Sequence, residues 1–156
     1  MQCTRNVTDH IIWVGANDRK LNLFENLFPI PRGVSYNAYL IKDEKNTLMD
    51  TIDASASEQF IENVAYALNG ESLDYLVVQH MEPDHGANIQ RILELYPEAK
   101  VVGNAKSMQM IGQFFRCGSR RQEGRSKRRR YTGTWKPYAS FCNGTDGTLA
   151  GGYGLL

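Results

Sequence analysis

Residues 80–85 read HMEPDH and bring two imidazoles and two carboxylates together in one short segment. The segment follows the apolar run LDYLVV (73–78) after a single glutamine. Imidazole mixed with carboxylate is a donor set for iron, manganese or zinc, whereas a thiolate site would need cysteines. Such a density of donors directly after a buried strand predicts a metal site.

The spacing of the donors indicates how they could be shared between ions. His80, Glu82 and Asp84 alternate, so an extended chain would point them to one side. His85 breaks the alternation, and a turn would swing it toward a second ion close by. A polar strand-to-helix turn, in which Asp84 or Asn88 caps the next helix, is the alternative interpretation.

The elements that would position these donors alternate along residues 1–115. Strands are predicted over 10–15, 35–42, 47–51, 73–78 and 99–104, and the second and third of these form a hairpin. One helix is predicted from the capping box Ser55–Glu58 to Leu68, and two more over 89–96 and 106–115. Strands that alternate with helices predict an α/β fold built in layers.

Charge is divided unevenly along the 156 residues. Up to Phe115 there are 9 Lys and Arg against 15 Asp and Glu, a net charge of −6, and from Arg116 onward there are 9 against 2, a net charge of +7. The second part contains the basic run SRRQEGRSKRRR and a glycine-rich end, with almost no apolar periodicity. We therefore expect a folded domain over 1–115 and a disordered basic tail over 116–156.

The cysteines and the N-terminal stretch indicate the cellular compartment. Cys3, Cys117 and Cys142 form no C-x-x-C pair and no disulfide framework, which favours a reducing interior. The start, MQCTRNVTDH, lacks the basic and apolar regions of a signal peptide, and no run approaches about 18 apolar residues. We expect a cytoplasmic protein without a membrane span.

HMEPDH after an apolar strand resembles the metal motif of the flavodiiron proteins, also called A-type flavoproteins. Residues 13–41 and 47–53 are also similar to the opening segments of that family, so the resemblance covers about residues 7–115. It implies a metallo-β-lactamase-like αββα sandwich, of which 1–115 would be the first half. In the family this domain holds two irons, and a following flavodoxin-like domain holds FMN.

Carried over residue by residue, the resemblance implies His80 and Glu82 as ligands of one iron and Asp84 and His85 as ligands of the other. Asp50, where its strand ends, is implied as a hydrogen-bonding partner of a ligating histidine, and a strand-end turn residue is the alternative. The family reduces O2 to water or NO to N2O with electrons from FMN, which a donor protein such as rubredoxin supplies.

The family's remaining ligands do not occur in this sequence: a histidine in a His-Trp-Pro segment, an aspartate in a Ser-x-Asp segment and a further histidine. Residues 141–154, FCNGTDGTLAGGYG, can be encoded so that reading one base later gives FVMAPMVHWPEVM, which is similar to the His-Trp-Pro segment. The same shift lets 116–119 and 128–133 yield the family-like stretches DVDL and EGDTL. These synonymous codons were selected to produce the match, which therefore shows compatibility only. We hypothesise a frameshift near Phe115–Arg116.

A chain with half of the ligands is expected to hold at most one weakly bound ion and to be inactive alone. Its uncovered sheet is expected to cause oligomerisation or aggregation. One alternative is a metallo-β-lactamase-fold hydrolase that uses zinc, although such hydrolases carry a histidine where this chain has Glu82. The other is a basic-tailed module that binds nucleic acid, which the frameshift hypothesis disfavours.

Overall fold

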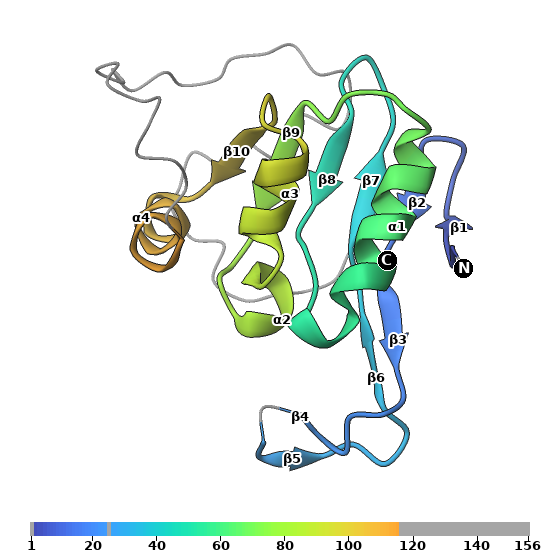
Figure 1. Cartoon of the computed structure of the whole chain (residues 1–156), viewed down its shortest axis with the longest axis vertical. Coiled ribbons are helices and arrows are strands. Elements are labelled where there is room, and N and C mark those ends of the chain that lie inside the picture. Colours follow the sequence, from blue (N-terminus) through green and yellow to red (C-terminus); the bar gives the residue numbers. More distant parts are fainter. Residues whose placement is uncertain (1, 25, 116–156) are drawn as a thin grey trace. The chain divides into compact units, whose positions relative to one another are not determined.

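The computed structural model describes residues 2–24 and 26–115 (Figure 1). The predictions made for residues 116–156, a disordered tail of frameshifted origin, lie outside the described residues. Within the described part, strands and helices alternate, and the predicted α/β fold is confirmed. No helix there is both long enough and apolar enough to cross a membrane.

A six-stranded sheet forms the centre of the fold, in the order β1, β2, β7, β8, β9, β10. Its strands are β1 (Arg5–Asn6), β2 (Ile11–Trp13), β7 (Tyr39–Ile41), β8 (Thr47–Met49), β9 (Tyr75–Val78) and β10 (Lys100–Gly103). β1, β2, β7 and β8 are antiparallel neighbours, and the predicted hairpin is the pair β7–β8. β8, β9 and β10 run parallel, so their carboxyl ends lie at one edge of the sheet.

Helices α1 and α3 lie over one face of this sheet (Figure 1). The helical elements are the 3-10 turn η1 (Ala54–Ala56), α1 (Ser57–Leu68), α2 (Pro83–Gly86), α3 (Ile89–Leu95) and α4 (Ala105–Phe114). On the face of the sheet toward the helices, the neighbouring side chains of Leu40, Leu48 and Leu76 are fully buried. Phe60 of α1 is fully buried as well. Each such side chain stabilises the fold by about 1.5–3 kcal/mol when it leaves water. One sheet with one helix layer matches the first half of the predicted sandwich.

The start of α1 differs from the predicted capping box. Asp53, and not Ser55, supplies the cap, because its Oδ1 accepts a hydrogen bond from the Ser55 N–H at 2.8 Å and begins η1. The helix ends as predicted: Asn69 is left-handed, with φ of 50°, and Gly70 follows with φ of 84°.

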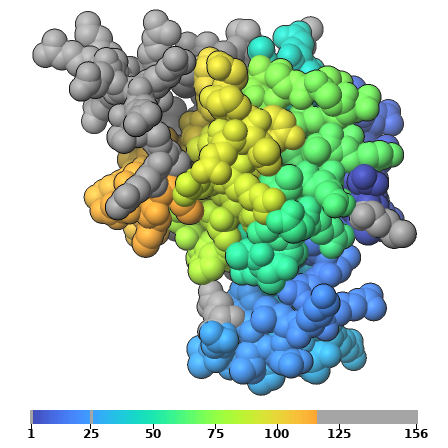
Figure 2. Space-filling view, in the orientation of Figure 1, coloured from blue at the N-terminus to red at the C-terminus, as the bar shows by residue number. Residues whose placement is uncertain are grey.

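Residues 16–36 form an arm made of two ribbons, which projects from the rest of the domain (Figures 1 and 2). β3 (Ala16–Asp18) pairs with β6 (Val34–Tyr36), and β4 (Leu23–Phe24) pairs with β5 (Phe28–Pro29). The prediction of one strand over 35–42 is therefore wrong, because β6 belongs to the arm and β7 to the main sheet. Where the arm meets the main sheet, Gly15 permits the close approach of Tyr36, since a Cβ there would collide with the Tyr36 carbonyl.

Candidate metal centre

The HMEPDH segment lies at the edge of the sheet where β8 and β9 end. Asp50 follows β8 directly, and Gln79 and His80 follow β9. The two strands are parallel, with Met49 opposite Val77, so both segments leave the sheet side by side. The Asp50 N–H donates to the Val77 carbonyl at 2.8 Å and extends this pairing by one residue. Parallel pairing thus brings Asp50 next to the donor segment.

The donor segment is only partly extended. Glu82 has extended backbone angles, φ −65° and ψ 150°, but Pro83 begins α2, and Asp84 and His85 lie on its helical turn. Proline suits the first position of a helix, where no N–H is needed. The alternation expected from the sequence therefore ends at Glu82, and the chain turn divides the donors into two pairs.

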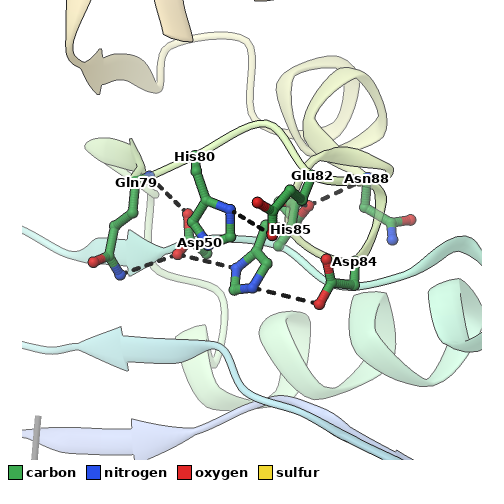
Figure 3. A network of polar contacts seen from close by, with 8 residues as sticks. Asp50, Gln79, His80, Glu82, Asp84, His85 and Asn88 are labelled. Atoms are coloured by element: carbon green, nitrogen blue, oxygen red, sulfur yellow. Dashed lines mark hydrogen bonds and ion pairs between the residues drawn. The ribbon is translucent and has the colours of Figure 1, made fainter. Parts of the chain in front are cut away.

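The four donors form one cluster of paired side chains (Figure 3). His80 Nδ1 lies 3.3 Å from Glu82 Oε2, and His85 Nε2 lies 3.6 Å from Asp84 Oδ2. The two imidazole rings lie against each other at a tilt, with 3.9 Å between their centroids. The pair before Pro83 is exposed to solvent, whereas the pair within α2 is mostly buried. The structure therefore brings all four sequence-predicted residues together.

Asp50 contacts this cluster from the strand ends. Its carboxylate is buried, and Oδ2 lies 3.3 Å from His85 Nδ1. Gln79 donates to both Asp50 oxygens, from its backbone N–H at 2.8 Å and from its side-chain amide at 3.0 Å. The Asp50 backbone is left-handed, with φ of 58°, a conformation that a non-glycine residue keeps only where its surroundings impose it. The contact expected between Asp50 and a histidine of the motif is present.

These neighbours change the pKa of His85. Burial disfavours the charged imidazole, but the hydrogen bond and charge of Asp50, with the charges of Asp84 and Glu82, outweigh burial and raise the pKa above its usual value. Because Nδ1 faces Asp50, the neutral ring with its proton on Nδ1 turns the Nε2 lone pair toward Asp84. His85 and Asp84 can therefore offer donors to the same cation.

Thr51 and Asn88 hold the donor turn, the helical turn α2 that carries Asp84 and His85, against the strand ends. Thr51 donates to the His85 carbonyl from its hydroxyl at 2.6 Å and from its N–H at 3.2 Å. Asn88 begins α3, yet its buried amide caps no helix and donates instead to the Ile52 carbonyl at 2.7 Å. Sequence reasoning missed these contacts and that of Gln79, because they join residues 29 to 36 positions apart.

The cluster fits a cation in its chemistry. In the described part of the chain, Asp84 Oδ1 is buried and has no hydrogen-bond partner, an unfavourable state for a carboxylate oxygen that a cation would relieve. Oxygen and imidazole donors suit iron, manganese or zinc. Within residues 2–24 and 26–115, however, no three His, Cys, Asp or Glu side chains converge as a metal site requires. The ligand roles assigned to the four donors therefore stay a prediction.

The family model described as ODP family beta lactamase matches residues 34–132. The match covers more than half of the chain and includes the whole cluster. The chain belongs to the ODP family. Because the match of the ODP family runs past Phe115, it does not set the boundary between a 1–115 domain and a 116–156 tail, and that boundary stays a prediction.

Similar proteins are named as a flavo-diiron protein and as a nitric oxide reductase. The chain is similar to the flavo-diiron protein FprA2 of Clostridium acetobutylicum, with 36% identity over 98 residues, which cover 63% of this chain and 24% of the relative. It is also similar to the nitric oxide reductase of Moorella thermoacetica, with 42% identity over 97 residues, 62% of this chain and 24% of that protein. The chain thus spans about a quarter of these relatives. The resemblance to flavodiiron proteins is confirmed.

Solved structures confirm the fold of this ODP chain. The rubredoxin oxygen:oxidoreductase of Desulfovibrio gigas matches with a TM-score of 0.67 at 31% identity, over 72% of this chain and 28% of that one. The flavodiiron protein of Giardia intestinalis matches with a TM-score of 0.68 at 23% identity, over 74% and 28%. The second likeness shows the fold alone. The predicted partial metallo-β-lactamase-like sandwich is confirmed.

Proposed function

We propose that this chain supplies the first half of the metal centre of a flavodiiron-type oxidoreductase, whose complete form reduces O2 to water or NO to N2O. The names of its relatives, a flavo-diiron protein, a nitric oxide reductase and a rubredoxin oxygen:oxidoreductase, support this reaction class. One observation carries the proposal: four imidazole and carboxylate donors form one cluster against Asp50 at the ends of parallel strands.

His80 and Glu82 hold one iron in this proposal, and Asp84 and His85 hold the other. When bound, iron supplies the electron transfer on which reduction of a diatomic gas depends. Glu82 offers an oxygen donor where related hydrolases carry a histidine, and this harder donor favours iron over the zinc of a hydrolase.

Other residues of the chain prepare these donors. Asp50 accepts a hydrogen bond from the Nδ1–H of His85 and fixes the ring with Nε2 toward Asp84. Gln79 holds the Asp50 carboxylate in place through its two hydrogen bonds. Thr51 fixes the backbone of the donor turn at the His85 carbonyl. The donors are thus oriented before a cation arrives, which lowers the entropic cost of binding it.

Electrons would come from FMN held by a further domain of the complete protein, with a rubredoxin-type protein as the donor. The names of two matches, a flavorubredoxin of Vibrio vulnificus and the Desulfovibrio oxidoreductase, support this partner class. The 156-residue chain by itself binds at most one ion and turns over neither gas, because it contributes only the first donors of the centre. A cytoplasmic setting belongs to the same proposal.

Titration of the metal-free full chain tests this proposal, with Fe(II) under anaerobic conditions and with Co(II) as a coloured substitute. We expect binding of about one ion, with release of protons from the ligands. The double variant His80→Ala/His85→Ala should lose this binding. His10→Ala removes an imidazole outside the cluster and is the matched control, which should bind as the parent chain does.

Two results would contradict the proposal. The first is a chain that binds neither Fe(II) nor Co(II), and the second is an equal loss in His10→Ala and in the double variant. A preference for zinc together with ester or thioester hydrolysis would favour the hydrolase alternative. Salt-sensitive binding to nucleic acid would favour the basic-tailed module.

A further inference from the structure

A polar hollow of about 180 Å³ lies within the arm, at the end of the β3–β6 ribbon where the chain leaves β3 and enters β6. Residues 17–19 line one side and residues 32–35 line the other. None of these residues belongs to the metal cluster. We propose that this hollow binds a small oxyanion, a phosphate or carboxylate group, between the guanidinium groups of Arg19 and Arg32.

The backbone brings the two arginines together. Asn17 pairs with Ser35 and Asp18 with Val34, so the chain leaves β3 at Arg19 beside the point where it enters β6. Gly33 closes this approach: its φ is 78°, and a Cβ there would collide with the Asp18 carbonyl and lie 2.8 Å from the Arg19 Cα. Only glycine allows so close a contact, which brings the backbone of residue 33 against Asp18 and Arg19, and Arg32 is the preceding residue.

The polar groups of the hollow are mostly free donors. Asn17 Oδ1 already accepts the Ser35 hydroxyl at 2.5 Å, which leaves the Asn17 amide N–H groups available. Asp18 Oδ1 accepts the N–H groups of Lys20 at 2.7 Å and Leu21 at 3.2 Å, and these bonds keep the pKa of Asp18 low. Among residues 2–24 and 26–115, neither Arg19 nor Arg32 forms an ion pair. Two unpaired guanidinium groups and an amide favour an anion.

Size and exposure limit what can bind. A volume of about 180 Å³ is below the roughly 300 Å³ at which pockets for drug-sized ligands begin, so the hollow suits a single phosphate or carboxylate group. Both arginines are exposed, so water and salt weaken their attraction for the anion. The ionised Asp18 reduces the net positive charge further. Weak, salt-sensitive binding is therefore expected.

Protection from phenylglyoxal, which modifies free guanidinium groups, tests this site on the full chain whatever its oligomeric state. Modification of each arginine is followed by peptide mass spectrometry in sodium phosphate, sodium acetate or sodium chloride at equal ionic strength. Phosphate or acetate should slow modification of Arg19 and Arg32 by about two- to fivefold relative to chloride, as expected for exposed ion pairs. Arg5 and Arg91 should be unaffected. The phosphate and acetate arms decide which oxyanion is preferred.

Two variants sharpen the test. Arg32→Gln should abolish the protection of Arg19, whereas Arg5→Gln, the matched removal of a charge elsewhere, should leave it intact. Asp18→Asn keeps an acceptor for the Lys20 and Leu21 N–H groups but removes a negative charge, so it should increase protection. No protection in either salt, equal protection at Arg5 and Arg91, or unchanged protection of Arg19 in Arg32→Gln would each overturn the proposal. None of these outcomes depends on metal binding.

Discussion

The carboxylate of Asp50 and the imidazole of His85 lie 3.3 Å apart although 35 positions separate them in the chain. Parallel pairing of β8 and β9 makes this contact, because it places the residue after β8 beside the segment after β9. The buried carboxylate leaves only one nitrogen of His85 facing Asp84. The parallel pairing of β8 and β9 thus decides which nitrogen of His85 faces Asp84.

Replacing Asp50 tests the dependence of metal binding on this contact. Asp50→Asn keeps the shape and tolerates a left-handed backbone, but it removes the charge that faces His85. We expect Co(II) affinity to fall by about 10- to 100-fold, as for other hydrogen-bonding partners of ligating histidines. Asp43→Asn alters a turn aspartate outside the cluster, which accepts a hydrogen bond from the Glu44 N–H, and serves as the control. Equal affinities in Asp50→Asn and the parent chain would contradict the role of Asp50.

The raised pKa of His85 predicts a pH dependence of the metal-free chain. The folded state holds the proton more tightly than the unfolded state, whose pKa is near the ordinary 6.5. The resulting stability is fully present below that value and is lost as pH rises through the folded-state pKa. Urea unfolding in the presence of a chelator should therefore give a free energy of unfolding that falls as pH rises above the ordinary value of 6.5. His85→Gln should flatten this slope, and a persistent slope would assign it to another group.

Asn88 should contribute to stability through its buried amide. Asn88→Ala leaves the Ile52 carbonyl without its partner and opens a small space, so we expect a loss of about 1–3 kcal/mol in the free energy of unfolding. Gln90→Ala removes an exposed amide that bonds Glu94 and should change stability by less than about 0.5 kcal/mol. Similar losses of unfolding free energy in the two variants would show that the buried Asn88 hydrogen bond makes no special contribution to stability.

Partly exposed apolar side chains on one face of the sheet predict self-association. Trp13, Tyr39, Met49 and Val77 alternate away from the helices and remain partly exposed. Apolar surface of this kind favours association or poor folding. Gel filtration of the full chain over a range of concentrations should therefore show oligomers or aggregates. A sharp monomeric peak with cooperative thermal unfolding would exclude this.

The coding DNA tests the proposed frameshift. If the tail is out of frame, a single-base change near the codons for Phe115 and Arg116 should restore a long reading frame similar to the flavodiiron family. That frame should contain the His-Trp-Pro segment suggested by residues 141–154. A nucleotide sequence in which no such change opens a family-like frame would end the hypothesis.

Local patterns predicted much of the main sheet. The continuous apolar run at 73–78 became β9, and the residues 99–104 became β10, each within two residues at its ends. β9 lies inside the sheet with Leu76 and Val78 buried, so burial and propensity agree there. β10 is the edge strand and none of its residues is buried, but its valines favour a strand. The run at 35–42 failed because its two halves pair with different sheets. No local sequence pattern indicates that residues 34–36 and 39–41 join different sheets.

The candidate site was predicted in composition but not in shape. Donor density after a strand indicated His80, Glu82, Asp84 and His85, and the resemblance to flavodiiron proteins indicated Asp50. Alternation failed because Pro83 starts a helical turn, a feature that proline at a first helical position does signal. The contacts of Gln79, Thr51 and Asn88 depend on pairing between distant segments, which a single sequence does not reveal.

Parallel strands β8 and β9 cannot pair until the crossover through α1 has closed. A peptide of residues 79–88 would therefore carry all four motif donors and still lack the Asp50 carboxylate that orients His85. Cation binding that depends on the Asp50–His85 contact would then appear only late in refolding, after loop closure is complete. If Co(II) is added to a refolding chain, the time at which its colour changes would report the time at which the crossover closes.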